Sequence, residues 1–181
     1  NNTNNTANLT KNNNKEKDIS NDIEDEDTIS PEDVDNYISN NIDNEIVSLS
    51  NSSKWDERKQ AFTNLSIYLK NNINKTSNET DSLIIKFIKF KLKDFKESNL
   101  NIVKEAIDVY ETLLDIPGFS KKHTSYAIKK LLDKWGDAKL RASVNAFFIK
   151  LMENQTPKHV LNILLKYAAN KTPNIIKEFN T

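Results

Sequence analysis

The chain lacks cysteine and holds few residues that interrupt helices. Its 181 residues include no cysteine, 2 glycines and 4 prolines. Without cysteine there is neither a disulfide framework nor a thiolate metal site, which fits a reducing compartment. No run of about 18 apolar residues occurs, so we expect no membrane span. With 29% charged and 36% hydrophobic residues, the composition indicates a soluble globular protein that carries some disordered sequence.

Sequence motifs of catalysis and metal binding are missing as well. The chain has no Gly-rich phosphate loop and no Gly-x-Ser-x-Gly nucleophile motif. His123 and His159 have no partner at metal-ligand spacing, and the acidic pair Asp56 and Glu57 suits the positive end of a helix dipole. The sequence therefore predicts a protein that is not an enzyme and that uses no metal or cofactor.

Charge is distributed unevenly although the formal net charge is zero. Residues 1–35 hold 3 Lys and 10 Asp or Glu, whereas residues 36–181 hold 23 Lys or Arg and 16 Asp or Glu. The folded part is therefore mildly basic. A basic body of this kind suits an acidic protein surface or a nucleic acid as its partner.

The sequence divides into a tail and a folded domain. Residues 1–29 are Asn-rich and acidic with almost nothing apolar to bury, so we expect them to be disordered. Residues 30–181 form the predicted domain. Its first helix is marked by Ser30 as the N-cap, by Pro31 in the first helical position and by Asp33, which completes a capping box.

Apolar residues recur with helical spacing through the whole domain, and no strand pattern competes. The helical segments come in pairs: 31–49 with 54–70, 80–95 with 99–115, 121–135 with 138–153, and 157–169 with a segment from 173 onward. The pattern predicts an all-α fold, an α-solenoid of about four HEAT-type antiparallel helix pairs. The second helix of the last pair is short, so we expect the C-terminal end of this solenoid to be truncated and the native protein to continue beyond Thr181.

The turn inside each pair has a similar sequence, namely SSKWDER, ESNLNIV, GDAKLRA and NKTPNII. Aligned, the turns place Trp55, Leu100, Leu140 and Pro173 at equivalent positions, 45, 40 and 33 residues apart by subtraction. In a stack of helical hairpins such turns fall on one edge. The predicted inward face is made of apolar residues on the second helices: Leu65, Leu69, Val103, Ile107, Leu114, Val144, Phe148 and Leu151.

These turns resemble those of TOG domains, the tubulin-binding HEAT arrays of the ch-TOG family of microtubule polymerases. The first carries the family's Trp-x-x-Arg pattern as WDER, followed by Ala61 and Leu65. The second has Glu97 in the acidic place of Asp-Ser-Asn, and the third reads GDAK, similar to Gly-Asp-x-Lys. The fourth has Thr172 in the Asn place of Lys-Asn-Pro. The run 118–139 is most similar to the third TOG domain of such arrays.

The resemblance covers roughly residues 31–181, and it spans four repeats where the family domain has six. It implies that the turns bind αβ-tubulin and microtubules, beside neighbouring TOG domains, in microtubule plus-end polymerisation and regulation. It also implies a place in the cytoplasm and cytoskeleton, at microtubules, the spindle and the microtubule-organising centre. The tubulin-binding residues that it implies are Lys54, Trp55, Ser98, Asn99, Leu100, Lys139, Arg141, Lys171 and Asn174.

Several of these residues could have structural roles instead of binding tubulin. Trp55 also suits a staple packed against its own repeat. Arg58 is interpreted as a structural residue that pairs with a neighbouring acid, and Trp135 as a core residue. Asn99 and Asp137 are residues that typically cap helices.

Further capping and surface roles are expected nearby. Ser53 and Asp56 are expected to cap the helix that carries the first Trp. The solvated side of a buried helix is the role expected for four lysines: Lys86, Lys89, Lys91 and Lys93.

Two other partner classes stay open. The chain could be a HEAT scaffold for another protein, such as an array neighbour or a centrosomal or kinetochore partner, without binding free tubulin. Nucleic acid is disfavoured because no exposed aromatic residues accompany the lysines.

Overall fold

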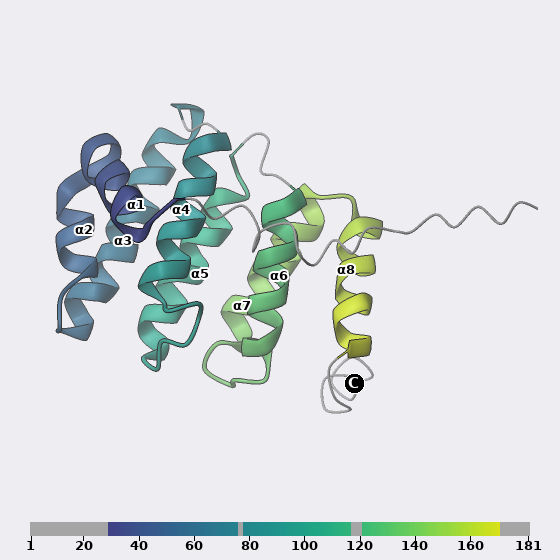
Figure 1. Cartoon of the computed structure of the whole chain (residues 1–181). Coiled ribbons are helices and arrows are strands. Elements are labelled where there is room, and N and C mark those ends of the chain that lie inside the picture. The colour runs from purple at the N-terminus through teal and green to yellow at the C-terminus, as the bar shows by residue number, and fades with distance from the viewer. Residues whose placement is uncertain (1–28, 76–77, 117–120, 171–181) are drawn as a thin grey trace, which may run out of the picture.

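A computed structural model describes residues 29–75, 78–116 and 121–170. Within these residues the chain is all-helical, and helix pairs stack side by side into an α-solenoid (Figure 1). The predicted fold class is therefore confirmed. The tail predicted over 1–29 lies outside the described residues except for Ile29, which packs against the core. The second helix of the fourth pair also lies outside them.

The helices follow the predicted pairs. The first pair consists of α1 (Pro31–Ile38), a π-helical turn η2 (Ser39–Asp43) and α2 (Asn44–Ser50), followed by α3 (Trp55–Asn72) with a 3-10 turn η3 (Ile73–Lys75). The second pair is α4 (Asn78–Lys91) and α5 (Leu100–Leu113). The third pair is α6 (Lys121–Trp135) and α7 (Arg141–Asn154), and α8 (Pro157–Asn170) begins the fourth.

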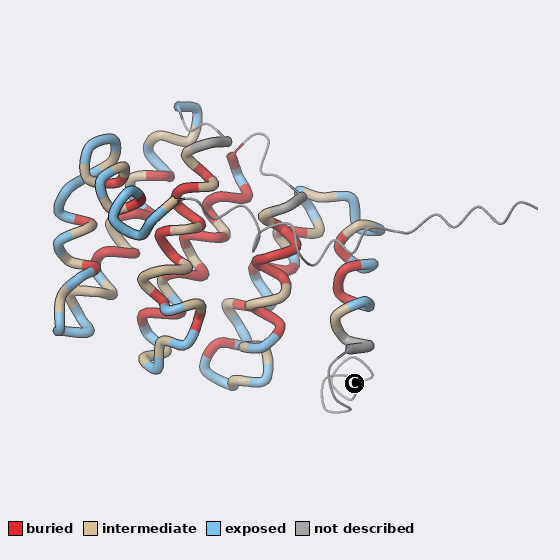
Figure 2. The backbone as a smooth tube through the Cα atoms, viewed as in Figure 1, coloured by how far each residue is buried: buried red, intermediate tan, exposed pale blue. Residues whose placement is uncertain are grey.

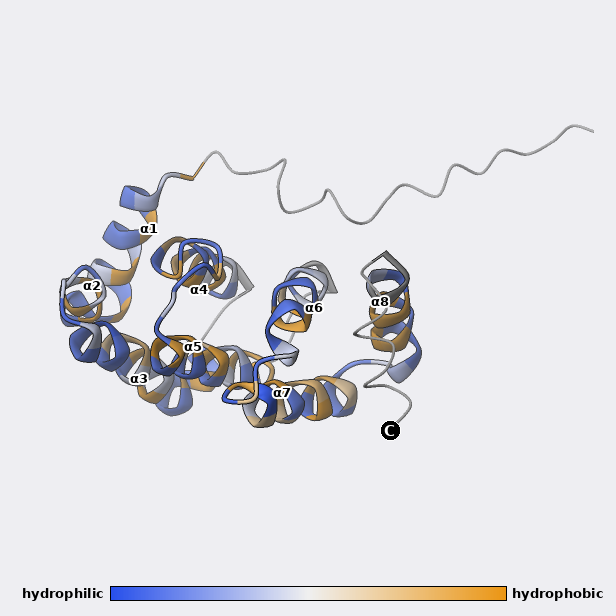
Figure 3. Cartoon of the chain, turned by 90° about the horizontal axis from the view of Figure 1, so that it is seen from below, coloured by the Kyte–Doolittle hydropathy of each residue, from blue (hydrophilic) through white to orange (hydrophobic). Residues whose placement is uncertain are grey.

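The helices form two layers. Helices α4, α6 and α8 lie in one layer, and α3, α5 and α7 lie in the other (Figure 3). The segment predicted as the first helix is interrupted at Asp43, which has an extended backbone. Asp43 caps α2 by accepting a hydrogen bond from the Glu45 N–H at 2.8 Å. As a result α1 packs beside α4 while α2 packs against α3.

Buried residues recur along the helices of every pair (Figure 2), and their apolar side chains form a core cluster. Every residue predicted for the inward face is buried, with at most 5% of its surface exposed. Aromatic rings fill the space between repeats, as where Phe62 of α3 meets Phe87 of α4 and Tyr110 of α5 meets Phe147 of α7. Fully burying one large apolar side chain contributes about 1.5–3 kcal/mol, so stacking is the main source of stability.

The start of the first helix matches its prediction. Ser30 Oγ accepts a hydrogen bond from the Asp33 N–H at 3.1 Å, and the Asp33 carboxylate accepts one from the Ser30 N–H at 3.1 Å. Pro31 occupies the first helical position. This reciprocal capping box satisfies N–H groups that have no partner within the helix.

The second pair departs from its prediction at the end of its first helix, which stops at Lys91 and not at residue 95. Lys93, Asp94 and Phe95 have positive φ angles of 50°, 56° and 64°. This left-handed backbone costs about 1–2 kcal/mol per residue outside glycine, and tertiary contacts offset the cost. Phe95 is 4% exposed, and Asp94 accepts hydrogen bonds from Lys130 and from the Tyr126 hydroxyl at 3.0 Å.

Asp94 thus joins the second turn to α6 of the third pair. Partial burial tends to raise the pKa of this carboxyl, but the hydrogen bonds from Lys130 and Tyr126 outweigh burial, so its pKa is lowered. The charged form is therefore the one that the fold stabilises.

Lys91 corrects another prediction. It was expected on a solvated face together with Lys86, Lys89 and Lys93, yet only 12% of its side chain is exposed. Its Nζ lies 2.6 Å from the Asp35 carboxylate and 2.7 Å from the Asn51 side-chain oxygen. Sequence periodicity could not predict this role, because a lysine that points into solvent and a lysine that pairs with another helix lie on the same face of their own helix.

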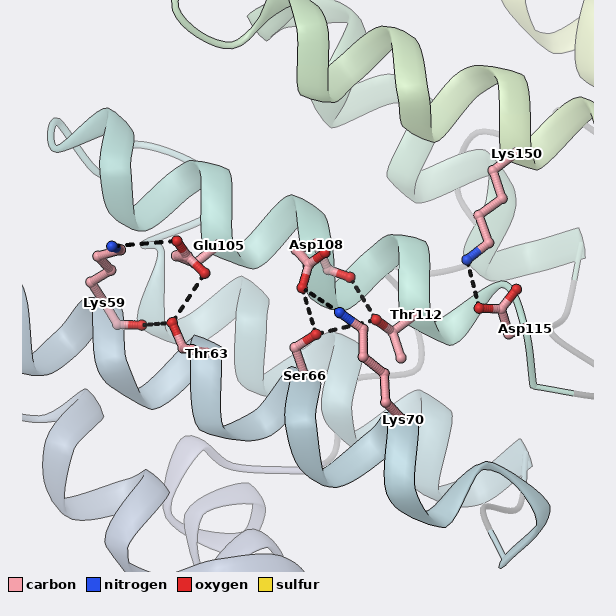
Figure 4. Close-up of polar contacts among 9 residues, drawn as sticks. All are labelled: Lys59, Thr63, Ser66, Lys70, Glu105, Asp108, Thr112, Asp115 and Lys150. Carbon is pink, nitrogen blue, oxygen red and sulfur yellow. Dashed lines mark hydrogen bonds and ion pairs between the residues drawn. The ribbon is translucent and has the colours of Figure 1, made fainter.

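Polar contacts also connect the second helices of neighbouring pairs (Figure 4). Thr63 donates to Glu105 at 3.0 Å, and Ser66 donates to Asp108 at 2.5 Å. Ion pairs lie beside these bonds, at 3.6 Å for Lys59–Glu105, 3.1 Å for Lys70–Asp108 and 2.6 Å for Lys150–Asp115. Because each contact requires particular residues to lie opposite each other, the set fixes the register of α3, α5 and α7.

One buried carboxyl opposes the fold at neutral pH. Asp81 of α4 is 1% exposed, and neither carboxylate oxygen has a hydrogen-bond partner among the described residues. Loss of hydration raises the pKa of Asp81 from 3.8 to about 6. The folded state therefore holds the proton on Asp81 more tightly than the unfolded chain does. The contribution of this proton to the free energy of unfolding is fully present below pH 3.8 and is lost as pH rises through about 6.

We expect Asp81→Asn to raise the melting temperature at pH 7.5, because it removes a destabilisation of roughly 3 kcal/mol from a buried charge. The difference from the parent should shrink steadily toward pH 4. Differential scanning calorimetry across this range measures it. Asp56→Asn, which removes an exposed carboxylate, is the matched control and should give no such pH-dependent gain. Parallel pH profiles for Asp81→Asn and the parent would contradict the assignment.

Candidate protein-binding edge

The turns inside the first three pairs lie along one edge of the solenoid. We call this the turn edge and define it as residues 51–54, 92–99 and 136–140 together with the first residue of each following helix. The three turns line the lower edge in Figure 1 and face the viewer in Figure 3. Lys171 and Asn174, which were predicted to bind tubulin from the fourth turn, lie outside the described residues.

Trp55 is the first residue of α3, and 48% of its surface is exposed. A staple role against its own repeat would bury the ring, so this degree of exposure favours a surface role. Trp135, in contrast, packs against the core with its ring 5.5 Å from that of Phe148. The two tryptophans therefore divide as predicted into an edge residue and a core residue.

The turn before Trp55 is held by residues other than the predicted ones. Ser52 Oγ accepts a hydrogen bond from the Lys54 N–H at 3.0 Å and donates to Glu57 at 2.6 Å. Lys54 Nζ lies 2.7 Å from the other Glu57 oxygen. Ser52 and Glu57 thus hold the turn, whereas the N-cap of α3, Lys54, has no side-chain cap, so the prediction that Ser53 and Asp56 cap this helix is wrong.

These contacts set the charge states of the first turn. The Lys54 ammonium and the Ser52 hydroxyl lower the pKa of Glu57. The Glu57 carboxylate in turn raises the pKa of Lys54. The Lys54 side chain nevertheless remains 68% exposed, so its charge is available at the edge.

Arg58 ties the first turn to the second. Its guanidinium donates to the carbonyl oxygens of Ser52 at 3.1 Å and Ser53 at 2.9 Å, and lies 3.5 Å from the Glu97 carboxylate. The pairing of Arg58 with a neighbouring acid is therefore confirmed. Because Arg58 reaches both turns, it holds the backbone that carries Trp55 in register with the next repeat.

The second turn presents polar groups. Glu97 accepts a hydrogen bond from the Asn99 N–H at 2.9 Å, and the Asn99 side chain caps α5 by accepting one from the Asn101 N–H at 3.0 Å. Ser98 is exposed. Leu100 begins α5 as Trp55 begins α3, but it is partly buried against the core.

The third turn presents basic groups. Asp137 accepts a hydrogen bond from the Lys139 N–H at 2.9 Å and so shapes the turn, but α7 has Leu140 as its N-cap and no side-chain cap, so the helix-capping role expected of Asp137 is wrong. Lys139 and Arg141 are exposed, whereas Leu140 is 1% exposed. Equivalent sequence positions therefore differ in environment, and the ring of Trp55 is the large apolar group that the described part of the turn edge exposes.

The edge carries a small positive excess at every turn. Residues 51–60, 93–104 and 133–141 each contain three basic and two acidic residues. Since several of the acids are engaged in the ion pairs and caps described above, exposed lysines such as Lys96 and Lys139 dominate the outer surface. The potential along the edge is therefore weakly positive.

The described residues contain no group of His, Cys, Asp and Glu side chains placed to hold a metal ion. None of their helices is long and apolar enough to cross a membrane. Comparisons of the chain with protein-family models, with curated proteins and with solved structures give no match. The resemblance to TOG domains accordingly rests on the turn sequences.

We predict that Arg58→Ala lowers the free energy of unfolding by about 1–3 kcal/mol, the range for a charged hydrogen-bonding group that leaves partners unsatisfied. More specifically, amide hydrogen exchange should accelerate both in residues 51–57 and in residues 96–101, since one side chain holds both turns. Lys54→Ala, which breaks only a local exposed pair, should leave residues 96–101 unchanged. Faster exchange confined to residues 51–57 in Arg58→Ala would rule out the coupling.

Proposed function

We propose that the chain is a protein-binding α-solenoid that holds αβ-tubulin at its turn edge, with Trp55 as the apolar anchor, and contributes to the regulation of microtubule plus ends. The identity of the partner comes from the resemblance of the turns to TOG domains. The half-exposed Trp55 ring on an otherwise polar, basic edge is the observation that carries the binding role. No chemistry is required of the domain, since its mechanism is positioned binding.

The anchor role follows from what Trp does at interfaces. Tryptophan is enriched among the residues whose truncation costs binding the most, commonly about 2 kcal/mol or more. Trp55 meets the structural requirement for such a residue, because Arg58 and the Ser52–Glu57 contacts fix the helix start that carries it. A fixed aromatic ring loses little conformational freedom when it is bound.

The charges of the edge suit an acidic partner such as the tubulin surface that the resemblance implies. Lys54, Lys139 and Arg141 lie at the first and third turns. Charges of this exposure steer association and fix register more than they add affinity. Ser98 and Asn99 at the second turn add polar groups between them.

A protein scaffold that does not bind free tubulin is the second candidate. It is favoured by α8, where Leu161 is 48% and Leu165 is 67% exposed. These leucines lie one helical turn apart on the last described helix and form an apolar face that suits packing against another helical element, of this solenoid or of an array neighbour. Size-exclusion chromatography with soluble tubulin separates the candidates, because the scaffold role predicts no co-elution at about 10–50 µM.

Trp55→Ala should weaken tubulin binding about tenfold or more while the melting temperature stays nearly unchanged, because the ring contributes little to the core. Ile67→Ala is the matched control, since Ile67 is 52% exposed on the same helix and lies away from the edge. Fluorescence titration with labelled tubulin and a parallel melt give both values. A large loss of thermal stability with unchanged binding would remove the anchor role.

Lys139→Glu should slow association with tubulin and reduce the dependence of the association rate on salt, because it reverses a steering charge. Stopped-flow measurements at two salt concentrations report both effects. Lys158→Glu makes the same change on an exposed residue at the start of α8, on the opposite edge. Equal effects of the two variants would show that overall charge, and not the turn edge, steers binding.

A further inference from the structure

A groove lies between α5 and α7, on the layer that also contains α3. It has a volume of about 500 Å³. Its α5 wall is formed by Lys104, Glu105, Asp108 and Glu111. Its α7 wall is formed by the small residues Ala142, Ser143 and Ala146. The proposed tubulin contact uses none of these side chains.

The side chains of the α7 wall are small, and two of the three are apolar. Ala142 and Ala146 are exposed and lie one helical turn apart, so their methyl groups point the same way. Ile149 continues this stripe by three residues and is 56% exposed. Small residues at this spacing let the backbone of another helix approach closely, while the isoleucine offers an apolar contact at one end.

The α5 wall carries three carboxylates and one lysine, Lys104, so its net charge is negative. Its carboxylates are spaced along the helix so that they face the groove in successive turns. Glu105 and Asp108 are also approached from α3 by Lys59 and Lys70, whose side chains are 42% and 56% exposed. Surface pairs of this exposure are worth only about 0–1 kcal/mol, so these carboxylates keep capacity for a second cation.

Burial and neighbouring charges both act on the Glu111 carboxyl. Partial burial, and then the neighbouring Asp108 carboxylate, raise the pKa of Glu111. Lys70 and Lys150 act in the opposite direction without cancelling these effects. A cation placed in the groove would relieve this unfavourable environment.

We propose that the groove between α5 and α7 binds an amphipathic helix of a partner protein, one with a small apolar stripe bordered by Lys or Arg. The apolar stripe lies on Ala142, Ala146 and Ile149, and the basic residues meet the carboxylates of α5. This is the helix-in-groove mode of recognition, in which apolar side chains one turn apart supply the contact. The carboxylates of α5 disfavour the acidic surfaces that the turn edge is proposed to bind.

The test uses the whole 181-residue chain and a fluorescein-labelled synthetic helix of about 14 residues with a Leu and Ala stripe flanked by Lys. Two matched peptides accompany it: one with Glu in place of Lys, and one with the same composition in scrambled order. Fluorescence anisotropy at roughly 150 mM salt, where long-range charge effects are screened, gives the affinities. The amphipathic basic peptide should bind most tightly of the three.

Two substitutions locate the binding site. Ala146→Arg places a large side chain in the groove and should weaken binding about tenfold. Glu111→Gln removes one charge pair and should weaken binding about threefold. Asn145→Arg is the matched control, because it adds the same charge to an exposed neighbouring position that does not line the groove. Trp55→Ala should leave peptide binding unchanged, which separates this site from the turn edge.

Equal binding of the scrambled or acidic peptide, or unchanged affinity in Ala146→Arg, would overturn the proposal. Self-association of the chain that Ala146→Arg abolishes would instead assign the groove to a second copy and would also overturn it. Circular dichroism of each variant verifies the fold. Since Ala146 and Glu111 are both at least partly exposed, neither substitution removes a buried core residue.

Discussion

The structure depends on the fact that one helix pair cannot bury its own apolar face. Each pair leaves one side of its core open, and only the next pair closes it. Burial of aromatic and aliphatic side chains between pairs therefore provides most of the stability, but it does not by itself specify register. The polar contacts do so, because bonds such as Ser66–Asp108 at 2.5 Å form only when α3 and α5 lie in one alignment.

The alignment of the helices in the core also sets the positions of the turns along the turn edge. Arg58 joins the first turn to Glu97 of the second, and Asp94 of the second turn joins Lys130 of α6. The first turn is thus linked to the second, and the second turn to α6, the helix that leads into the third turn. A partner that contacts several turns meets a surface whose spacing is already set, so less freedom is lost on binding.

Much of this could be predicted from the sequence, since helical periodicity and the Ser30 cap are local properties. The pairing of helices and the inward face of Leu65 or Val144 followed from spacing alone. The environment of equivalent turn residues did not, because Leu140 is the N-cap of α7 and buried whereas Trp55 is the first residue of α3 and exposed, a difference that spacing cannot report. Lys91 and the left-handed residues 93–95 were missed for a related reason, since contacts from other repeats determine them.

A turn edge with one exposed large apolar residue has a consequence for how such a domain works. Affinity that rests on one aromatic anchor and a few exposed charges is modest and depends on salt. Tight attachment then requires further contacts, either from additional repeats or from several linked domains. Linking raises the effective concentration of each site, so domains of modest affinity can hold a partner firmly while every single contact exchanges quickly.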